Sequence, residues 1–169
     1  SMNEYINFWN ITEDALEYAM ETLNIKNEEL KNKLLDLYLK LEAYPEVEKV
    51  LMQLKKEGYQ TGILSNGSEE MLASAVKNAK LENLLDKVLS VEKCKVYKPS
   101  SKVYDLVEKE FKINKINCAF FSSNAWDMHA AAHYGFKTIW VNRFEGNLEK
   151  LPGKPYKIVQ TLEKIVDIL

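Results

Sequence analysis

Apolar positions along the chain change their spacing near residue 44, and the change predicts two kinds of structure. Before that point, apolar side chains recur three or four positions apart, as on one face of a helix. One such stripe is Ala15, Leu16, Ala19, Met20 and Leu23, and the next is Leu30, Leu34, Leu37, Tyr38 and Leu41. We expect two antiparallel helices, the first beginning near Thr12, joined by a turn over 24–27.

Beyond residue 44, short apolar runs alternate with amphipathic stretches. The runs predict strands at 61–64, 88–91, 118–121, 138–141 and 158–159. The stretches predict helices at 45–57, from Ser68 onward, at 99–111, 126–134 and 161–169, with Ser68 as a cap and Gly135 as a stop. Strands that alternate with helices predict a parallel sheet covered on both faces. The chain is therefore expected to be an α/β protein, with a helical piece over 1–43 and an α/β core over 44–169.

The charge balance, the apolar runs and the cysteines indicate which kinds of partner and compartment the sequence favours. The 169 residues carry 23 Lys and Arg against 25 Asp and Glu, with the two signs interspersed. This balance indicates neither a nucleic-acid nor a membrane partner. No apolar run is long enough to span a bilayer. Cys94 and Cys118 lack metal-type spacing, which favours free thiols in a reducing compartment.

Three polar clusters carry the candidate chemistry, and each follows an apolar run. They are Ser65-Asn66-Gly67, then Lys98-Pro99 with Tyr104 close behind, and then Ser122-Ser123-Asn124-Ala125-Trp126-Asp127. In an open α/β sheet, ligands bind at the carboxyl ends of the strands. We therefore expect the three clusters to form one site.

The first two clusters are ambiguous when each is taken alone. Ser65, Asn66 and the backbone of Gly67 present hydrogen-bonding groups at a helix start, which suits a carboxylate or phosphate. A plain strand-to-helix turn explains them equally well. Lys98 could neutralise a carboxylate or a developing oxyanion, although a lone lysine in a loop is usually solvated. Tyr104 alone is more typical of packing.

The third cluster is the most specific. Ser122, Ser123 and Asn124 crowd three hydrogen-bonding side chains at one strand end, and Trp126 and Asp127 follow at a helix start. Asp127 could cap that helix. A tryptophan beside the carboxylate is harder to explain by capping, and an apolar wall next to a general base is the functional alternative.

Other motifs are excluded or disfavoured. His129 and His133 are four positions apart on one helix and could face one metal, but no third ligand is evident, so surface histidines are the default. The segment from Gly62 through Ser65 to Gly67 is one residue too long for a G-x-S-x-G elbow, which argues against a serine hydrolase. The six glycines form no nucleotide-binding motif.

Taken together and in this order, the clusters resemble the haloacid dehalogenase superfamily, and within it the type II L-2-haloacid dehalogenases. The resemblance runs from about Met2 to the C-terminus and includes Thr12-Glu13-Asp14-Ala15-Leu16, Tyr97-Lys98-Pro99 and Trp140-Val141-Asn142-Arg143. It implies a Rossmann-type parallel-sheet core with a small helical cap piece. The implied reaction is hydrolytic dehalogenation of (S)-2-haloalkanoic acids through an aspartyl ester. The resemblance also implies no cofactor, a cytoplasmic location and a homodimer.

The resemblance assigns roles to the residues of the network. Ser65 and Asn66 would hold carboxylate groups. Lys98 would pair with the charge of the nucleophile. Tyr104 and Ser122 would support this network.

It also assigns roles around the substrate. Asn124 would contact the nucleophile or the departing halide, and Asp127 would orient or activate the hydrolytic water. Phe8 and Trp126 would form the apolar pocket. No metal is implied, because a hard dication needs several charged oxygen ligands and Asp127 is the only acidic residue of the third cluster.

One part of the family pattern is missing. The resemblance implies a nucleophilic aspartate in an Asp-x-x-Gly-Thr context on a first strand, which this sequence does not contain. In the family that strand lies between the strands ending at Ser65 and at Ser122. We therefore expect a truncated chain that is inactive alone. The sheet should show a gap or a direct pairing of those two strands, with edges that invite strand exchange.

Two alternatives stay open. The chain could be a non-catalytic relic that binds a small carboxylate or a protein partner, although the retention of Lys98, Asn124 and Asp127 argues mildly against this. A phosphatase of the same superfamily is less favoured, because its magnesium needs further acidic residues within the third cluster, where only Asp127 is acidic.

Overall fold

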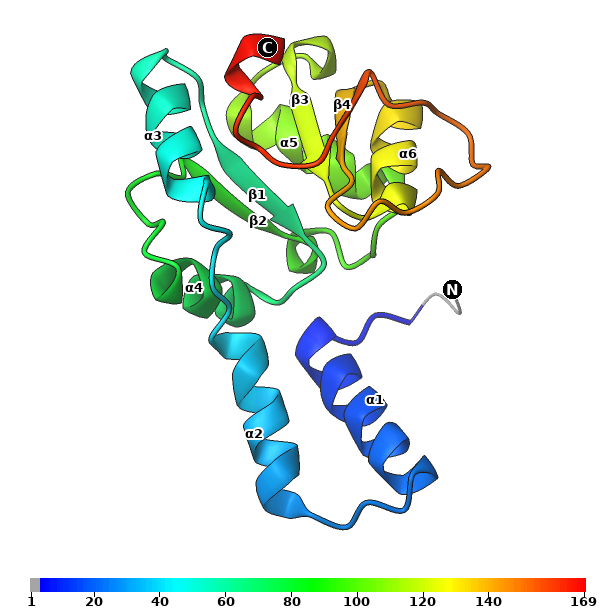
Figure 1. Cartoon of the computed structure of the whole chain (residues 1–169). Coiled ribbons are helices and arrows are strands. Elements are labelled where there is room, and N and C mark those ends of the chain that lie inside the picture. The colour runs from blue at the N-terminus through cyan, green and yellow to red at the C-terminus, as the bar shows by residue number, and fades with distance from the viewer. Residues whose placement is uncertain (1–3) are drawn as a thin grey trace.

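The computed structural model describes residues 4–169 (Figure 1). The helices are α1 (Phe8–Thr22), α2 (Glu28–Leu39), α3 (Val47–Lys56), α4 (Glu69–Asn78), α5 (Ser101–Phe111) and α6 (Ala125–Tyr134). The strands are β1 (Gly62–Ser65), β2 (Lys87–Ser90), β3 (Ala119–Ser122), β4 (Lys137–Val141) and β5 (Lys157–Val159). Every strand pairing is parallel, so the α/β prediction is confirmed.

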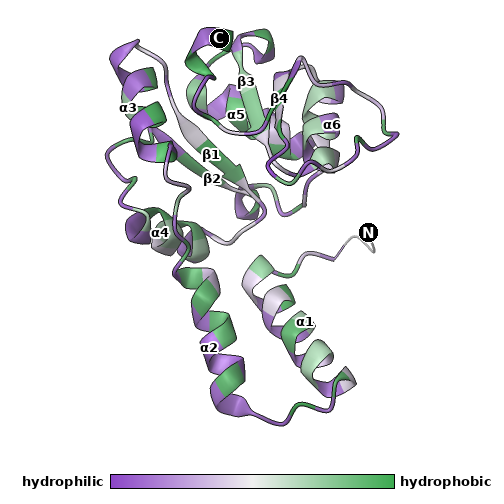
Figure 2. Ribbon diagram, in the orientation of Figure 1, coloured by the Kyte–Doolittle hydropathy of each residue, from purple (hydrophilic) through white to green (hydrophobic). Residues whose placement is uncertain are grey.

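Helices α1 and α2 form a hairpin that projects from the rest of the fold (Figure 1). Hydrophobic and hydrophilic bands alternate along α2, as its sequence pattern predicts (Figure 2). Helix α1 begins earlier than predicted, because the Asn7 side chain accepts a hydrogen bond from the Asn10 amide and caps it. Thr12 lies inside the helix and bonds back to the Phe8 carbonyl. The domain boundary near residue 44 stays a prediction.

The parallel strands form two separate sheets instead of one continuous sheet. Strands β1 and β2 make the first, and β3, β4 and β5 make the second in that order. Strands β1 and β3 line the same cavity of about 1180 Å³ and do not pair with each other. The expected gap is therefore present, and the direct pairing is not.

The main core lies between β2, α5 and α6. Its buried residues are Leu89, Tyr104, Leu106, Val107, Ala131 and Phe136. Tyr104 is fully buried and packs edge-on against Phe120 and Phe136. This packing holds α5 and α6 rigidly behind the strand ends that carry the polar clusters.

The predicted helix over 161–169 is wrong. Only a short 3₁₀ turn, Val166–Ile168, forms there. Ile165 is buried against Val50 and Leu54 of α3, and the Leu162 amide reaches the Glu46 carboxylate. These tertiary contacts fix the backbone in a form that the apolar spacing alone could not reveal.

Candidate active site

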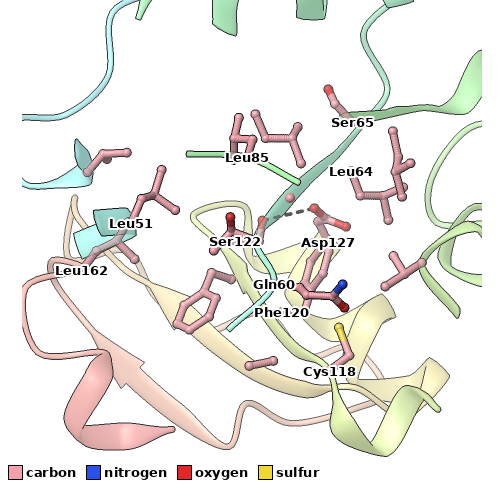
Figure 3. Close-up of a pocket in the computed structure, with 18 of the residues that line it drawn as sticks. Leu51, Gln60, Leu64, Ser65, Leu85, Cys118, Phe120, Ser122, Asp127 and Leu162 are labelled. Carbon is pink, nitrogen blue, oxygen red and sulfur yellow. Dashed lines mark hydrogen bonds between the residues drawn. The ribbon is translucent and has the colours of Figure 1, made fainter. Parts of the chain in front are cut away.

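Two strand ends meet at one edge of the cavity. The Lys98 ammonium donates to the Leu64 carbonyl of β1 at 2.9 Å and to the Asp127 carboxylate at 2.8 Å. The Ser122 hydroxyl, at the end of β3, donates to the same Asp127 oxygen at 3.2 Å. Figure 3 shows Ser122 and Asp127 next to the Leu64–Ser65 end of β1. Members of all three clusters therefore come together, as the sequence predicts.

Asp127 is the centre of this network. Its side chain is buried and accepts a third hydrogen bond, 2.9 Å long, from the Tyr104 hydroxyl. Burial raises the pKa of Tyr104, and the charge of Asp127 raises it further, so the phenol stays a neutral donor. Helix α6 has Asn124 as its N-cap residue, so Asp127 does not cap it and the capping alternative is wrong.

Lys98 is a buried cation with a defined position. Its side chain is only 7% exposed. Burial lowers the pKa of Lys98, and the negative charge of Asp127 opposes that shift. The Lys98 backbone amide donates to the Asn66 side-chain oxygen at 3.1 Å, so Asn66 fixes the loop that carries the lysine. The solvated-lysine alternative is therefore wrong.

The turn after β1 is bonded internally. The Gly67 amide donates to the Ser65 hydroxyl, the Met71 amide donates to the Ser68 hydroxyl, and the Glu69 amide donates to the Glu92 carboxylate. These amides already have partners, and the Ser65 and Asn66 side chains line the cavity. Their predicted role stays a prediction.

Ser90 is a residue behind the site that supports the turn after β1, and sequence reasoning missed it. It is 1% exposed, and its hydroxyl donates to the Gly67 carbonyl at 2.7 Å, which ties the turn to β2. The register places Ser90 beside Ser65. No signal in the sequence could have identified it, because the contact depends on how β1 and β2 align.

An apolar wall borders the polar edge. Phe8 from the start of α1 and Trp126 from α6 both line the cavity, as predicted. The Phe8 ring lies 6.1 Å from the ring of Tyr97, centroid to centroid. Asn124 also lines the cavity. Tyr104 does not line it and acts from behind through Asp127.

The donor set does not suit a metal. Within residues 4–169, no group of three or more His, Cys, Asp or Glu residues could hold an ion. His129 is buried, and its Nδ1 lies 2.8 Å from the Gly153 carbonyl. It is therefore a packed core residue, and its assignment to the helix surface is wrong. His133 is exposed, as expected.

Comparison with known proteins decides the family. Residues 1–141 match the family model described as haloacid dehalogenase-like hydrolase. The chain belongs to this family. It is 39% identical over 157 residues to (S)-2-haloacid dehalogenase 4A of Burkholderia cepacia, which covers 92% of this chain and 68% of that protein. It is also 39% identical over 165 residues to an (S)-2-haloacid dehalogenase of Pseudomonas fluorescens. That match covers 97% of this chain and 73% of the other protein.

Solved structures place this family member among the L-2-haloacid dehalogenases. A crystallised dehalogenase superposes with a TM-score of 0.96 at 36% identity, covering 99% of this chain and 75% of that one. The L-2-haloacid dehalogenase of Xanthobacter autotrophicus with chloropropionic acid covalently bound superposes with a TM-score of 0.90 at 28% sequence identity. That match covers 99% of this chain and 77% of the other. The predicted family is confirmed. A phosphatase of Thermococcus onnurineus shares the fold alone, at 17% identity. No helix within residues 4–169 could cross a membrane.

Proposed function

We propose that this protein supplies most of the active site of an enzyme that releases halide from short (S)-2-haloalkanoic acids by hydrolysis. The observation that carries the proposal is the buried Lys98–Asp127 pair, held at the shared edge of β1 and β3 by Ser122, Tyr104 and the Leu64 carbonyl. The relatives that are named (S)-2-haloacid dehalogenases support the substrate class.

The proposed chemistry has two steps. A carboxylate oxygen of an aspartate on a first strand attacks C2 of the substrate, the carbon–halogen bond breaks, and halide leaves with the electron pair. Water then attacks the ester carbonyl, which releases the 2-hydroxy acid and regenerates the aspartate. Asp127 takes the proton that the water loses and returns it to the departing oxygen of the 2-hydroxy acid, and the regenerated carboxyl group loses its own proton to solvent.

Each residue of the site has a role in this scheme. Lys98 neutralises the nucleophilic carboxylate and its transition-state charge. Ser65 and Asn66 hold the carboxylate of the substrate, and Asn124 contacts the departing halide. Trp126 and Phe8, both on the cavity wall, surround the alkyl group and the halogen.

We further propose that this chain is inactive by itself. Asp127 is the one acidic side chain that lines the cavity within residues 4–169. It already accepts hydrogen bonds from three donors, and its partner Lys98 holds it in place. A carboxylate fixed in this way orients water but cannot also travel to C2 of a substrate.

The test is chloride release from the two enantiomers of 2-chloropropanoate. The chain would be assayed beside a version extended at its N-terminus by a strand that carries aspartate in an Asp-x-x-Gly-Thr context. We expect release from the (S) enantiomer by the extended form only, and none when that aspartate is replaced by asparagine. Chloride release by the unextended chain would contradict the proposal. Magnesium-dependent hydrolysis of p-nitrophenyl phosphate by the extended form, without chloride release, would assign a phosphatase instead.

A further inference from the structure

The hairpin of α1 and α2 carries Phe8, which lines the cavity from the first residue of α1. Figure 1 shows that the hairpin projects from the core, with the turn between its two helices farthest from the strands. The end of α2 is held by α4. The Ser74 hydroxyl donates to the Leu39 carbonyl at 2.9 Å. The Asn78 side-chain amide donates to the Leu41 carbonyl at the same distance.

The start of α1 is held by Tyr97. The Tyr97 hydroxyl donates to the Ile6 carbonyl, and within residues 4–169 no other hydrogen bond joins residues 4–27 to the core. Burial raises the pKa of Tyr97, so the phenol stays a neutral donor. The Tyr97 ring also stacks on Tyr5, with 5.4 Å between the centroids, and contacts Phe8 at 6.1 Å. One side chain therefore contacts the whole segment that leads into α1.

A second side chain of the same loop contacts this segment. The Lys95 ammonium lies 5.0 Å from the centroid of the Tyr5 ring. A cation at this distance over an aromatic face is attracted to it. Tyr5 is thus contacted by both Lys95 and Tyr97, which lie just before Lys98 in the chain.

The loop over 95–98 is fixed from the side of the strands as well. The Lys98 amide donates to the Asn66 side chain, and the Lys98 ammonium bonds to Asp127. Neither Tyr5 nor Tyr97 lines the cavity. Tyr97 nevertheless contacts Phe8 on the apolar wall and is joined to Lys98 by a peptide bond. A displacement of the Tyr97 ring would therefore move the wall and the cation together.

We propose that Tyr97 is a positioning residue that couples the apolar wall of the cavity to Lys98. Tyr5, Phe8 and Tyr97 form an aromatic latch, which holds the start of α1 against the loop over 95–98. The latch fixes Phe8 relative to Lys98 and so sets the length of the alkyl chain that the cavity accepts. This last consequence rests on the proposed function, whereas the coupling itself does not.

The first test uses the chain as it is and measures Lys98 from a distance. Tyr5→Leu weakens the latch without changing the sequence of the loop that carries the lysine. The readout is the rate at which acetic anhydride acetylates Lys98, measured by peptide mass spectrometry against the exposed Lys26. We expect a severalfold higher rate for Tyr5→Leu. The matched control is Tyr18→Leu, which removes an exposed tyrosine of the same hairpin and should leave the rate unchanged.

Variants of Tyr97 separate its ring from its hydroxyl. Tyr97→Leu should raise the acetylation rate of Lys98 as Tyr5→Leu does, and Tyr97→Phe, which keeps both ring contacts, should raise it less. Loss of the one hydrogen bond in Tyr97→Phe should speed hydrogen exchange of the Ile11 amide, in the first turn of α1, about two- to tenfold. The amide of Ile139, which is buried in β4, should exchange as in the parent chain.

Two results would overturn the coupling. Faster exchange at Ile11 without faster acetylation of Lys98 would show that the latch holds α1 but does not reach the lysine. Equal acceleration at Ile11 and Ile139 would show a loss of global stability and no positioning role.

The consequence for substrate choice is tested in the N-terminally extended form. The readout is the ratio of kcat/KM for (S)-2-chloropropanoate to that for (S)-2-chlorobutanoate, which differ by one methylene. We expect Tyr5→Leu and Tyr97→Leu to change this ratio at least threefold. Partial unfolding lowers both values by the same factor, so an unchanged ratio would reject the role in substrate choice. Coupled acetylation of Lys98 in a protein whose extended form releases no chloride would keep the latch and reject the proposed function.

Discussion

The buried pair of Lys98 and Asp127 carries the electrostatics of the site. The two side chains are 7% and 8% exposed, so water screens their attraction little. Either residue alone would be a buried charge without a counter-ion. Tyr104 and Ser122 also donate hydrogen bonds to the carboxylate, which orients Asp127.

Replacing one member of this pair should lower the free energy of unfolding substantially. Replacing both should lower it by less than the sum of the two single losses. Asp127→Asn leaves the Lys98 charge unpaired and should lower the free energy of unfolding by about 3–5 kcal/mol. The double variant Lys98→Met with Asp127→Asn should recover part of that loss. Urea unfolding of the two single variants and the double variant measures the coupling. Additive losses would show that the two groups do not depend on each other.

The sequence predicted which polar side chains come together in the site, but it did not predict the residues behind them that hold the surrounding backbone in place. Lys98, Ser122 and Asp127 were expected together because parallel strands end at one edge. Ser90 could not be predicted, because its bond to the Gly67 carbonyl depends on the register between β1 and β2. The burial of His129 depends on the Gly153 loop, which no periodicity places.

At the scale of the element, β1 depends on an acid outside the site. The Asp86 carboxylate accepts from the Thr61 amide at 2.7 Å and pairs with Lys55, which fixes the residue before the strand. The hydrogen bond from Lys55 and then that from the Thr61 amide lower the pKa of Asp86. A carboxyl whose pKa is lower in the folded state stabilises the fold above its unfolded-state pKa.

Asp86→Ala should therefore show a pH-dependent effect. Near neutral pH we expect a loss of about 1 kcal/mol, discounted because the pair is partly exposed. The loss should shrink as the pH falls through the lowered folded-state pKa of Asp86, since protonation removes the same stabilisation from the parent chain. Unfolding at several pH values checks this, with the exposed Asp14→Ala as control. A loss that stays constant with pH would contradict the assignment.

Gly62 in β1 has no room for a side chain. A Cβ there would lie 2.6 Å from the Phe111 ring and 2.8 Å from the Lys87 carbonyl. Gly62→Ala should lower the free energy of unfolding by about 1–3 kcal/mol through overpacking. Gly67→Ala is the matched control, because its Cβ would meet the flexible end of Leu72 at 3.2 Å. Equal losses by urea unfolding would mean that the packing of Phe111 on β1 is loose.

The elements themselves were predictable to within a few residues. The strands fall within one residue of their predicted places, because continuous apolar runs have clear ends. Helix α6 stops at Gly135, whose φ of 116° is left-handed, as expected of a glycine C-cap. The segment after β5 was misassigned, because Ile165 packs on α3 instead of continuing a helix.

At the scale of the whole molecule, the sheet is divided in two. Alternating strands and helices predict a parallel α/β fold but not where a sheet is interrupted, so the gap was expected only from the family resemblance. The extended form should unfold at a higher urea midpoint and with a larger m value than this chain, because completing the sheet buries more surface. Identical midpoints and m values would show that the added strand does not enter the gap.

We propose that Asp127 activates water against an ester formed at this site. Its most direct test is the mass of the extended chain after incubation with (S)-2-chloropropanoate. With Asp127→Asn, the ester should form but not hydrolyse, so we predict one added propanoate unit on the aspartate of the added strand. The parent extended chain should show none at the end of the reaction. Absence of the adduct from the variant, or an adduct on a residue of this chain, would contradict these roles of Asp127 and of the aspartate on the added strand.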